Sequence, residues 1–176
     1  MSMYNSLKKL YNSFAAFVYK VTIKRKHIEL AAFFETPKMS RYHHILCALR
    51  YVYIENYYGE NDFGKQLYID VNQWGSEQSM QYDIEKFDAL IKSIEVNGYD
   101  SKSAIFADLD RNCINGTHRL ALCAYFEIKN IPTKTLRRHL KRTKTIEEMK
   151  EFYKLSNDDF ARLEAAYCRM RAKIFT

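Results

Sequence analysis

The chain has 176 residues, 47% of them hydrophobic, which is enough apolar material for one domain with a buried core. Its five glycines and two prolines argue against a loop-rich β-sandwich or barrel, and favour an α+β fold rich in helix. The four cysteines are scattered without a C-x-x-C pair, which disfavours a disulfide framework or a zinc site and indicates a cytoplasmic protein. No apolar run approaches the roughly 20 residues that a membrane-spanning helix needs.

The formal net charge of +7 is unevenly distributed. Basic residues collect in residues 8–26 and 134–144, whereas residues 55–95 are rich in acidic side chains. Solvated helix faces are the ordinary explanation of such clusters. A phosphate-rich or otherwise anionic partner is the alternative.

An amphipathic helix is expected over residues 7–21. Apolar side chains recur there at three- and four-residue steps and form one stripe: Leu7, Leu10, Tyr11, Phe14, Phe17, Val18 and Val21. We expect this helix to pack on the core or on a second subunit, which would give a homodimer. Because the cluster Lys24-Arg25-Lys26 follows, attachment of the helix to an anionic membrane surface is the alternative, with the protein then membrane-peripheral.

The middle of the chain shows three further elements. A helix is expected over residues 40–58, ending before Gly59. Residues 67–71 read Leu-Tyr-Ile-Asp-Val and alternate like a strand. After a polar linker, residues 84–96 have the helical period, and Asn97-Gly98 supplies a left-handed C-terminal stop.

A short hairpin and a long helical end complete the expected order. Residues 104–107 predict a strand, and Cys113-Ile114 predicts its return strand. A helix through about Phe126 and a strand near residues 133–136 should follow. The remainder is expected to be helical, with one start at Thr145 and a second at Ser156.

The turn between the hairpin and the next helix carries the chemistry. A strand that ends at Ile114, a glycine at Gly116 and a helix that begins at Thr117 together place free backbone N–H groups at the positive end of a helix dipole. This arrangement predicts an anion site. Thr117 adds a hydroxyl, and Arg119 adds a fork of donors that suits phosphate oxygens.

His118 beside Arg119 strengthens the prediction, because two donor side chains at a helix N-terminus have little reason to be there for packing alone. The competing interpretation is a capped helix in which His118 and Arg119 make structural hydrogen bonds only.

The residues also resemble a family. Residues 67–136 resemble the ParB/sulfiredoxin superfamily in the order of their expected elements, which is strand, helix and hairpin. The resemblance continues in the motif Ile114-Asn115-Gly116-Thr117-His118-Arg119 and in the later segment Glu127-Ile128 to Ile131-Pro132. The short G-x-x-R core of that superfamily corresponds to Gly116-Thr117-His118-Arg119. In related domains this loop binds the phosphates of CTP or ATP, so the resemblance implies that residues 115–119 hold a nucleotide.

Departures from the family pattern help to choose among its activities. Sulfiredoxins carry a catalytic cysteine where Thr117 stands, which disfavours sulfiredoxin chemistry. Partition proteins have a helix-turn-helix domain that the residues after Thr145 do not show, which disfavours base-specific DNA binding, although the basic run at residues 134–144 can still hold a nucleic-acid backbone. The kinase-like members show Asp-Gly-x-His-Arg, and here Asn115 replaces the aspartate, with loss of a negative charge that could hold Mg²⁺.

A phosphotransferase also needs a carboxylate as base or metal ligand. Six carboxylates near the motif are candidates: Asp70, Glu77, Asp83, Glu85, Asp108 and Asp110. We favour Glu77 and Asp83, because they follow the first expected strand, where the catalytic carboxylate of the kinase-like members roughly falls.

The sequence therefore predicts an N-terminal helical segment (1–66), a ParB/sulfiredoxin-like core (67–136) and a C-terminal helical extension (137–176). The expected function is binding of ATP or CTP with Mg²⁺ and transfer of phosphate to a small hydroxyl-bearing metabolite or sugar, with His118 aiding charge stabilisation. By analogy with similar short proteins, surface-polysaccharide biosynthesis is a suitable setting. The alternatives are a non-catalytic module switched by a nucleotide or phosphosugar, and a nucleic-acid-binding protein.

Overall fold

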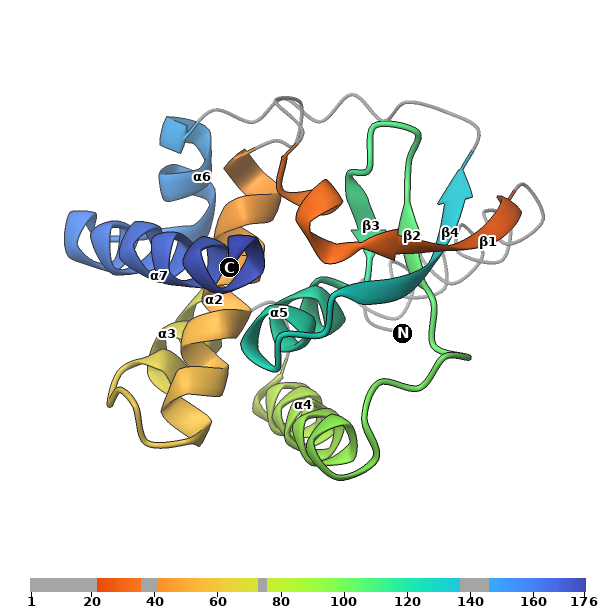
Figure 1. The fold of residues 1–176 in the computed structure, drawn as a ribbon. Coiled ribbons are helices and arrows are strands. Elements are labelled where there is room, and N and C mark those ends of the chain that lie inside the picture. Colours follow the sequence, from red (N-terminus) through yellow and green to blue (C-terminus); the bar gives the residue numbers. More distant parts are fainter. Residues whose placement is uncertain (1–21, 36–40, 73–75, 137–145) are drawn as a thin grey trace, which may run out of the picture.

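The computed structural model describes residues 22–35, 41–72, 76–136 and 146–176, with the side chains of residues 22–25, 41–43 and 146–147 excepted. The helix expected over residues 7–21, the cap at Thr145 and most of the basic run at 134–144 lie outside the described residues. Helices and strands are both present, as the composition predicts (Figure 1). In chain order they are β1 (Thr22–Glu29), the 3-10 helix η1 (Leu30–Phe33), α2 (Arg41–Tyr57), α3 (Gly64–Val71), α4 (Glu77–Asn97), β2 (Ile105–Ala107), β3 (Cys113–Asn115), α5 (Thr117–Tyr125), β4 (Asn130–Leu136), α6 (Ile146–Tyr153) and α7 (Asn157–Phe175).

The strands form one mixed sheet in the order β1-β4-β2-β3. β1 pairs antiparallel with β4, and β2 pairs antiparallel with β3 as the expected hairpin. β2 and β4 run parallel, since α5 carries the chain back across the sheet between them. In Figure 1 the sheet lies at the right, α2, α3, α6 and α7 gather at the left, and α5 lies between the two groups.

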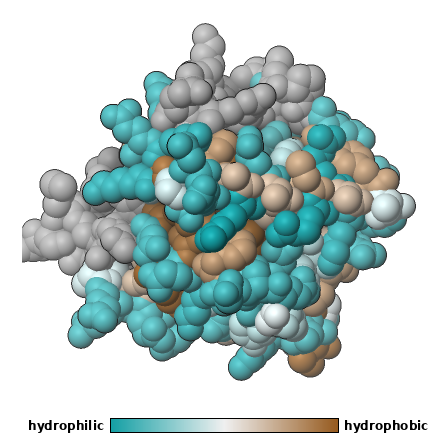
Figure 2. All heavy atoms as spheres, turned by 90° about the vertical axis from the view of Figure 1, so that its left-hand side faces the viewer, coloured by the Kyte–Doolittle hydropathy of each residue, from teal (hydrophilic) through white to brown (hydrophobic). Residues whose placement is uncertain are grey.

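Two central helices organise the core. In α2, side chains on every side are buried from Leu49 to Glu55, so this helix is surrounded rather than amphipathic, and it packs against α3, α5 and α7. In α5, five successive residues from Leu120 to Ala124 are buried. Buried apolar side chains from most of the elements, the first at Leu30 and the last at Ile174, form one hydrophobic cluster. The face that carries α6 and α7 is mostly hydrophilic around a smaller hydrophobic patch (Figure 2).

The strand predicted at residues 67–71 is wrong: these residues belong to helix α3. The start signal is Asn61, whose side-chain oxygen accepts the backbone N–H groups of Phe63 (3.2 Å) and Gly64 (2.8 Å). Leu67, Tyr68 and Val71 are then buried at helical spacing. A five-residue apolar run fits both periods, so periodicity alone could not decide between strand and helix.

The segment 1–66, expected to be helical, contributes the strand β1 to the sheet. Pairing with β4 along its length explains the strand, because Lys24, Lys26 and Ile28 have Cα partners at Thr135, Thr133 and Ile131. Its local composition is basic rather than β-branched, so tertiary pairing overrides local propensity here.

The other elements predicted within the described residues are confirmed, and the largest change in bounds is at the start of α4. α2 ends where Gly59 takes a φ of 77°, and α4 ends at Gly98 with a φ of 70°. α4 begins seven residues earlier than expected, at Glu77, because the Ser76 hydroxyl accepts the Ser79 N–H. Ser156 caps α7 in the same way, through the Asp159 N–H at 3.0 Å.

Candidate functional site

The turn from β3 into α5 has the conformation that the sequence predicts. Gly116 takes a φ of 115° as the residue before the helix, and a Cβ at this position would lie 3.1 Å from Ile105 Cγ1. The first intrahelical bond of α5 runs from the Leu120 N–H to the Gly116 carbonyl. The N–H groups of Thr117, His118 and Arg119 therefore have no acceptor within the helix and lie at the positive end of its dipole.

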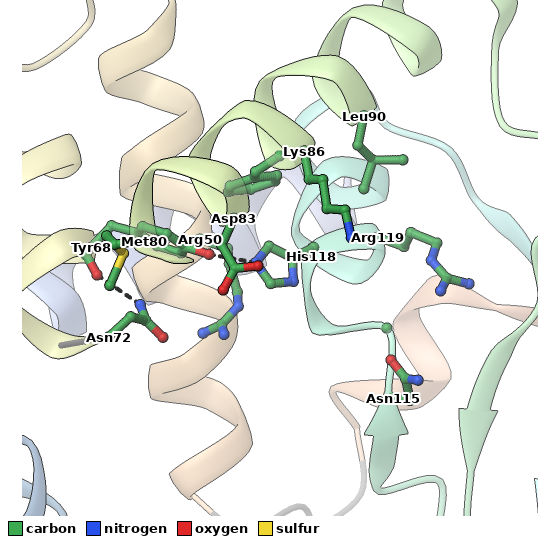
Figure 3. A pocket seen from close by; sticks show the side chains of 12 residues that line it. Arg50, Tyr68, Asn72, Met80, Asp83, Lys86, Leu90, Asn115, His118 and Arg119 are labelled. Atoms are coloured by element: carbon green, nitrogen blue, oxygen red, sulfur yellow. Dashed lines mark hydrogen bonds between the residues drawn. The ribbon is translucent and has the colours of Figure 1, made fainter. Parts of the chain in front are cut away.

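This turn forms one wall of a pocket of about 330 Å³ (Figure 3). The other walls come from α2, α3 and α4, so four separate parts of the chain meet here. The lining residues are Arg50, Tyr68, Asn72, Met80, Asp83, Lys86, Phe87, Leu90, Asn115, Gly116, His118 and Arg119.

His118 lies at the centre of the lining. Its Nε2 atom is 2.8 Å from the Tyr68 hydroxyl, and its ring meets the Phe87 ring edge to face at 4.5 Å between centroids. Burial holds the pKa of His118 well below 6.5, and the nearby charges of Arg50 and Arg119 lower the pKa further. His118 is therefore a neutral imidazole at neutral pH, able to accept or donate one hydrogen bond at each nitrogen according to tautomer.

Arg50 enters the pocket from the buried helix α2 and is only 8% exposed. One guanidinium nitrogen donates to the Leu46 carbonyl at 2.9 Å, and the guanidinium carbon lies 5.8 Å from the Tyr68 ring centroid. Its Nε atom is buried without a hydrogen-bond partner. A buried cation with an unsatisfied donor is costly and is uncommon unless it has a function.

Arg119 and Lys86 add two further cations to the lining. Arg119 donates a hydrogen bond to the Ala104 carbonyl at 2.8 Å, which ties α5 to the residue before β2, and it is also hydrogen-bonded to the Tyr99 side chain. Since a guanidinium has five N–H donors, part of its fork remains for a ligand. Lys86 lies on α4 with its ammonium 4.1 Å from the Tyr82 ring centroid. With Arg50, the pocket carries three permanent positive charges against the single carboxylate of Asp83.

Asp83 lies on the face of α4 that looks into the pocket (Figure 3). Burial raises the pKa of Tyr68, Arg50 opposes this shift and Asp83 adds to it, so all three side chains interact electrostatically. Among the lining residues Asp83 is the one carboxylate, and the described residues hold no group of three His, Cys, Asp or Glu side chains that could hold a metal ion. One carboxylate is too few to hold a metal ion by protein side chains alone, so a Mg²⁺ at this site would need a bound ligand to supply most of its oxygen atoms.

The structure brings together most of the predicted site and separates the rest. Asn115, Gly116, His118 and Arg119 line the pocket, and Thr117 lies in the same turn without lining it. Of the two favoured carboxylates, Asp83 lines the pocket and Glu77 does not: it is exposed in the first turn of α4. The other four candidate carboxylates do not line the pocket: Asp70, Glu85, Asp108 and Asp110.

Sequence reasoning missed Arg50, Tyr68 and Lys86. Arg50 could have been found from its sequence neighbours, because it stands among apolar residues within the predicted helix, as in Leu49-Arg50-Tyr51-Val52. Tyr68 was hidden by the wrong assignment of a strand. Lys86 shares a face with Asp83 at a three-residue step on α4, but such pairs are common on solvated helices and carry no signal alone.

Comparison of the chain with family models, curated proteins and solved structures gave no match.

Proposed function

We propose that this pocket binds the phosphate groups of a nucleotide, ATP or CTP, and that the protein transfers a phosphoryl group to a small hydroxyl-bearing metabolite or sugar. The observation that carries the proposal is the meeting of the α5 N-terminus with Lys86 and Arg119 around one cavity. Phosphoryl transfer depends on positioning and on stabilising negative charge, which such a pocket supplies.

Each part of the pocket has its own role in the proposed reaction. The close turn at Gly116 and the N–H groups of α5 suit phosphate oxygens, and Arg119 and Lys86 would add charge-assisted hydrogen bonds. Asp83 is the candidate base for the acceptor hydroxyl. Neutral His118 would position ligand atoms through a hydrogen bond rather than through a full charge, and Tyr68 holds its ring. Mg²⁺, when bound with the nucleotide, would neutralise part of the phosphate charge.

The resemblance to the ParB/sulfiredoxin superfamily supports the same ligand, since its G-x-x-R core falls on the turn that lines the pocket. The resemblance was based in part on a strand at residues 67–71, and these residues form a helix. The resemblance therefore depends mainly on the turn at Gly116 and on the elements after it. A sugar or glycan precursor as acceptor, in surface-polysaccharide biosynthesis, rests on the resemblance alone.

Asn115 favours a second candidate function, a nucleotide-dependent switch without turnover. It stands where the kinase-like members carry an aspartate, and it lines the pocket with an uncharged amide. If Asp83 cannot replace that aspartate, the pocket would bind a nucleotide and change the stability of the surrounding helices without chemistry.

Thermal unfolding with and without ATP or CTP, in the presence of Mg²⁺, tests the binding step. A nucleotide at about a hundred times its dissociation constant should stabilise the wild type by about 2.7 kcal/mol. Arg119→Ala should remove most of this stabilisation, whereas the control Arg171→Ala, on the exposed face of α7, should retain it. Absence of stabilisation by any nucleotide in the wild type would refute nucleotide binding.

Nucleotide turnover separates the enzyme from the switch. The proposed phosphotransferase should consume ATP or CTP in the presence of Mg²⁺ and a pool of hydroxyl-bearing metabolites, and Asp83→Asn should abolish the reaction without weakening nucleotide binding. Saturable binding with no turnover in any condition would favour the switch.

A further inference from the structure

Arg50 is a buried charge that no residue in the described parts of the chain neutralises with a salt bridge. Its 8% exposure follows from its place in the central helix α2, between side chains that pack on α3 and α5. No carboxylate among the described residues forms a salt bridge with it. Removing a cation from water without a partner is strongly unfavourable, so an anion that enters the pocket gains by pairing with it.

The groups nearest to Arg50 leave part of its donor fork open. One nitrogen is used by the Leu46 carbonyl, and the Nε atom has no partner. Tyr68 presents its ring rather than an anion, because burial raises the pKa of its hydroxyl. His118 is neutral and cannot compensate the charge. The remaining donors therefore suit an oxyanion from outside the protein.

Arg50 also lies apart from the phosphate-binding turn. In Figure 3 its guanidinium lies on the α2 and α3 side of His118, whereas Asn115 and Arg119 lie on the opposite side of the His118 ring. The two groups of donors thus lie on either side of His118, and the Asp83 carboxylate lies on the Arg50 side of its ring (Figure 3). The volume of about 330 Å³ is at the small end for a ligand pocket, so it suits phosphate groups and a small molecule rather than a second large ligand.

We propose that Arg50 forms a second oxyanion subsite, separate from the α5 N-terminus, which binds an anionic group of the acceptor. The acceptor class is then a small hydroxyl compound that carries a phosphate ester or a carboxylate. That the bound anion belongs to a phosphoryl acceptor rests on the proposed function, whereas the subsite itself requires only an oxyanion. Asp83, on the Arg50 side of His118, would face the acceptor hydroxyl.

Inorganic phosphate serves as the probe of the subsite, and Arg50→Met as the variant. Phosphate is titrated by thermal unfolding into protein saturated with ATP and Mg²⁺, so that the α5 N-terminus is already occupied. The wild type and the control Arg171→Ala should bind phosphate, and Arg50→Met should bind it roughly 10- to 100-fold more weakly while its affinity for ATP stays close to that of the wild type. Carboxylates such as acetate, titrated in the same way, distinguish the two acceptor classes.

A measurement on the wild type removes dependence on the folding of the variant. The Arg50 side-chain Nε–H resonance, identified by its absence from the spectrum of Arg50→Lys or Arg50→Met, should shift on addition of phosphate. An unshifted resonance, or equal phosphate affinity in the wild type and Arg50→Met, would overturn the subsite. Loss of ATP and phosphate binding together in Arg50→Met would overturn its separateness. Phosphate binding that depends on Arg50 in a protein that binds no nucleotide would uphold the subsite and refute the proposed function.

Discussion

Acidification should destabilise the protein through His118. Its pKa in the folded state lies well below 6.5 because of burial and of the charges of Arg50 and Arg119, whereas in the unfolded chain it is ordinary. Below pH 6.5 the unfolded state therefore binds more protons than the folded state, and the free energy of unfolding falls as the pH falls. Where His118 stays neutral in the folded state, a fall from about pH 7.5 to about pH 5.5 should cost up to about 1.4 kcal/mol from this one group.

Urea denaturation of the wild type and His118→Gln at several pH values measures this effect. Glutamine keeps a hydrogen-bonding side chain without a titrating group, so the difference in unfolding free energy between the two proteins should shrink by up to about 1.4 kcal/mol over that range. His27, exposed on β1, supplies the control His27→Gln for the loss of a histidine as such. Parallel pH curves for wild type and His118→Gln would refute the neutral, buried imidazole.

Two substitutions outside the pocket test the packing of α2. Arg169 donates two hydrogen bonds to the buried Glu55 carboxylate at 2.9 and 2.8 Å, and the Arg169 side chain is half exposed. Arg169→Met should therefore destabilise the protein by about 1–3 kcal/mol in urea denaturation. A loss below about 0.5 kcal/mol would contradict an important ion pair. A Cβ at Gly64 would lie 2.0 Å from the Val52 carbonyl oxygen, so Gly64→Ala should lower the free energy of unfolding by about 3 kcal/mol or more. The control Gly59→Ala has open space around its Cβ and should cost only about 1 kcal/mol, because of its positive φ. Equal losses in the two variants would disprove the close approach of α3 to α2.

Local signals in the sequence were sufficient where one residue determines an element boundary. Gly59, Gly98 and Ser156 each end or begin a helix through their own backbone or side chain, and the structure has all three boundaries. The turn at Gly116 is of the same kind, because strand, glycine and helix follow one another within a few residues. The anion-binding turn could therefore be located without any tertiary information.

Features that depend on distant contacts were not predictable in this way. β1 is a strand because β4 pairs with it, and α3 is a helix because Asn61 starts it and α2 buries one of its faces. The same limit applies to the pocket: Arg50 and Tyr68 reach it only because α2 and α3 pack beside α5. Sequence proximity to the motif directed attention to Glu77, whereas helix geometry selects Asp83.

The pairing of β1 with β4 has a consequence for how the chain folds during synthesis. β1 is made early, but its only described sheet neighbour is β4, and β2 likewise lies between β4 and β3. Until residues 130–136 leave the ribosome, β1 has no described sheet neighbour on either edge, while α2 and α3 can already form local contacts. Nascent chains stopped before β4 should therefore contain helices without a complete sheet, and they should be more prone to aggregation than the full chain, through the edge of β1.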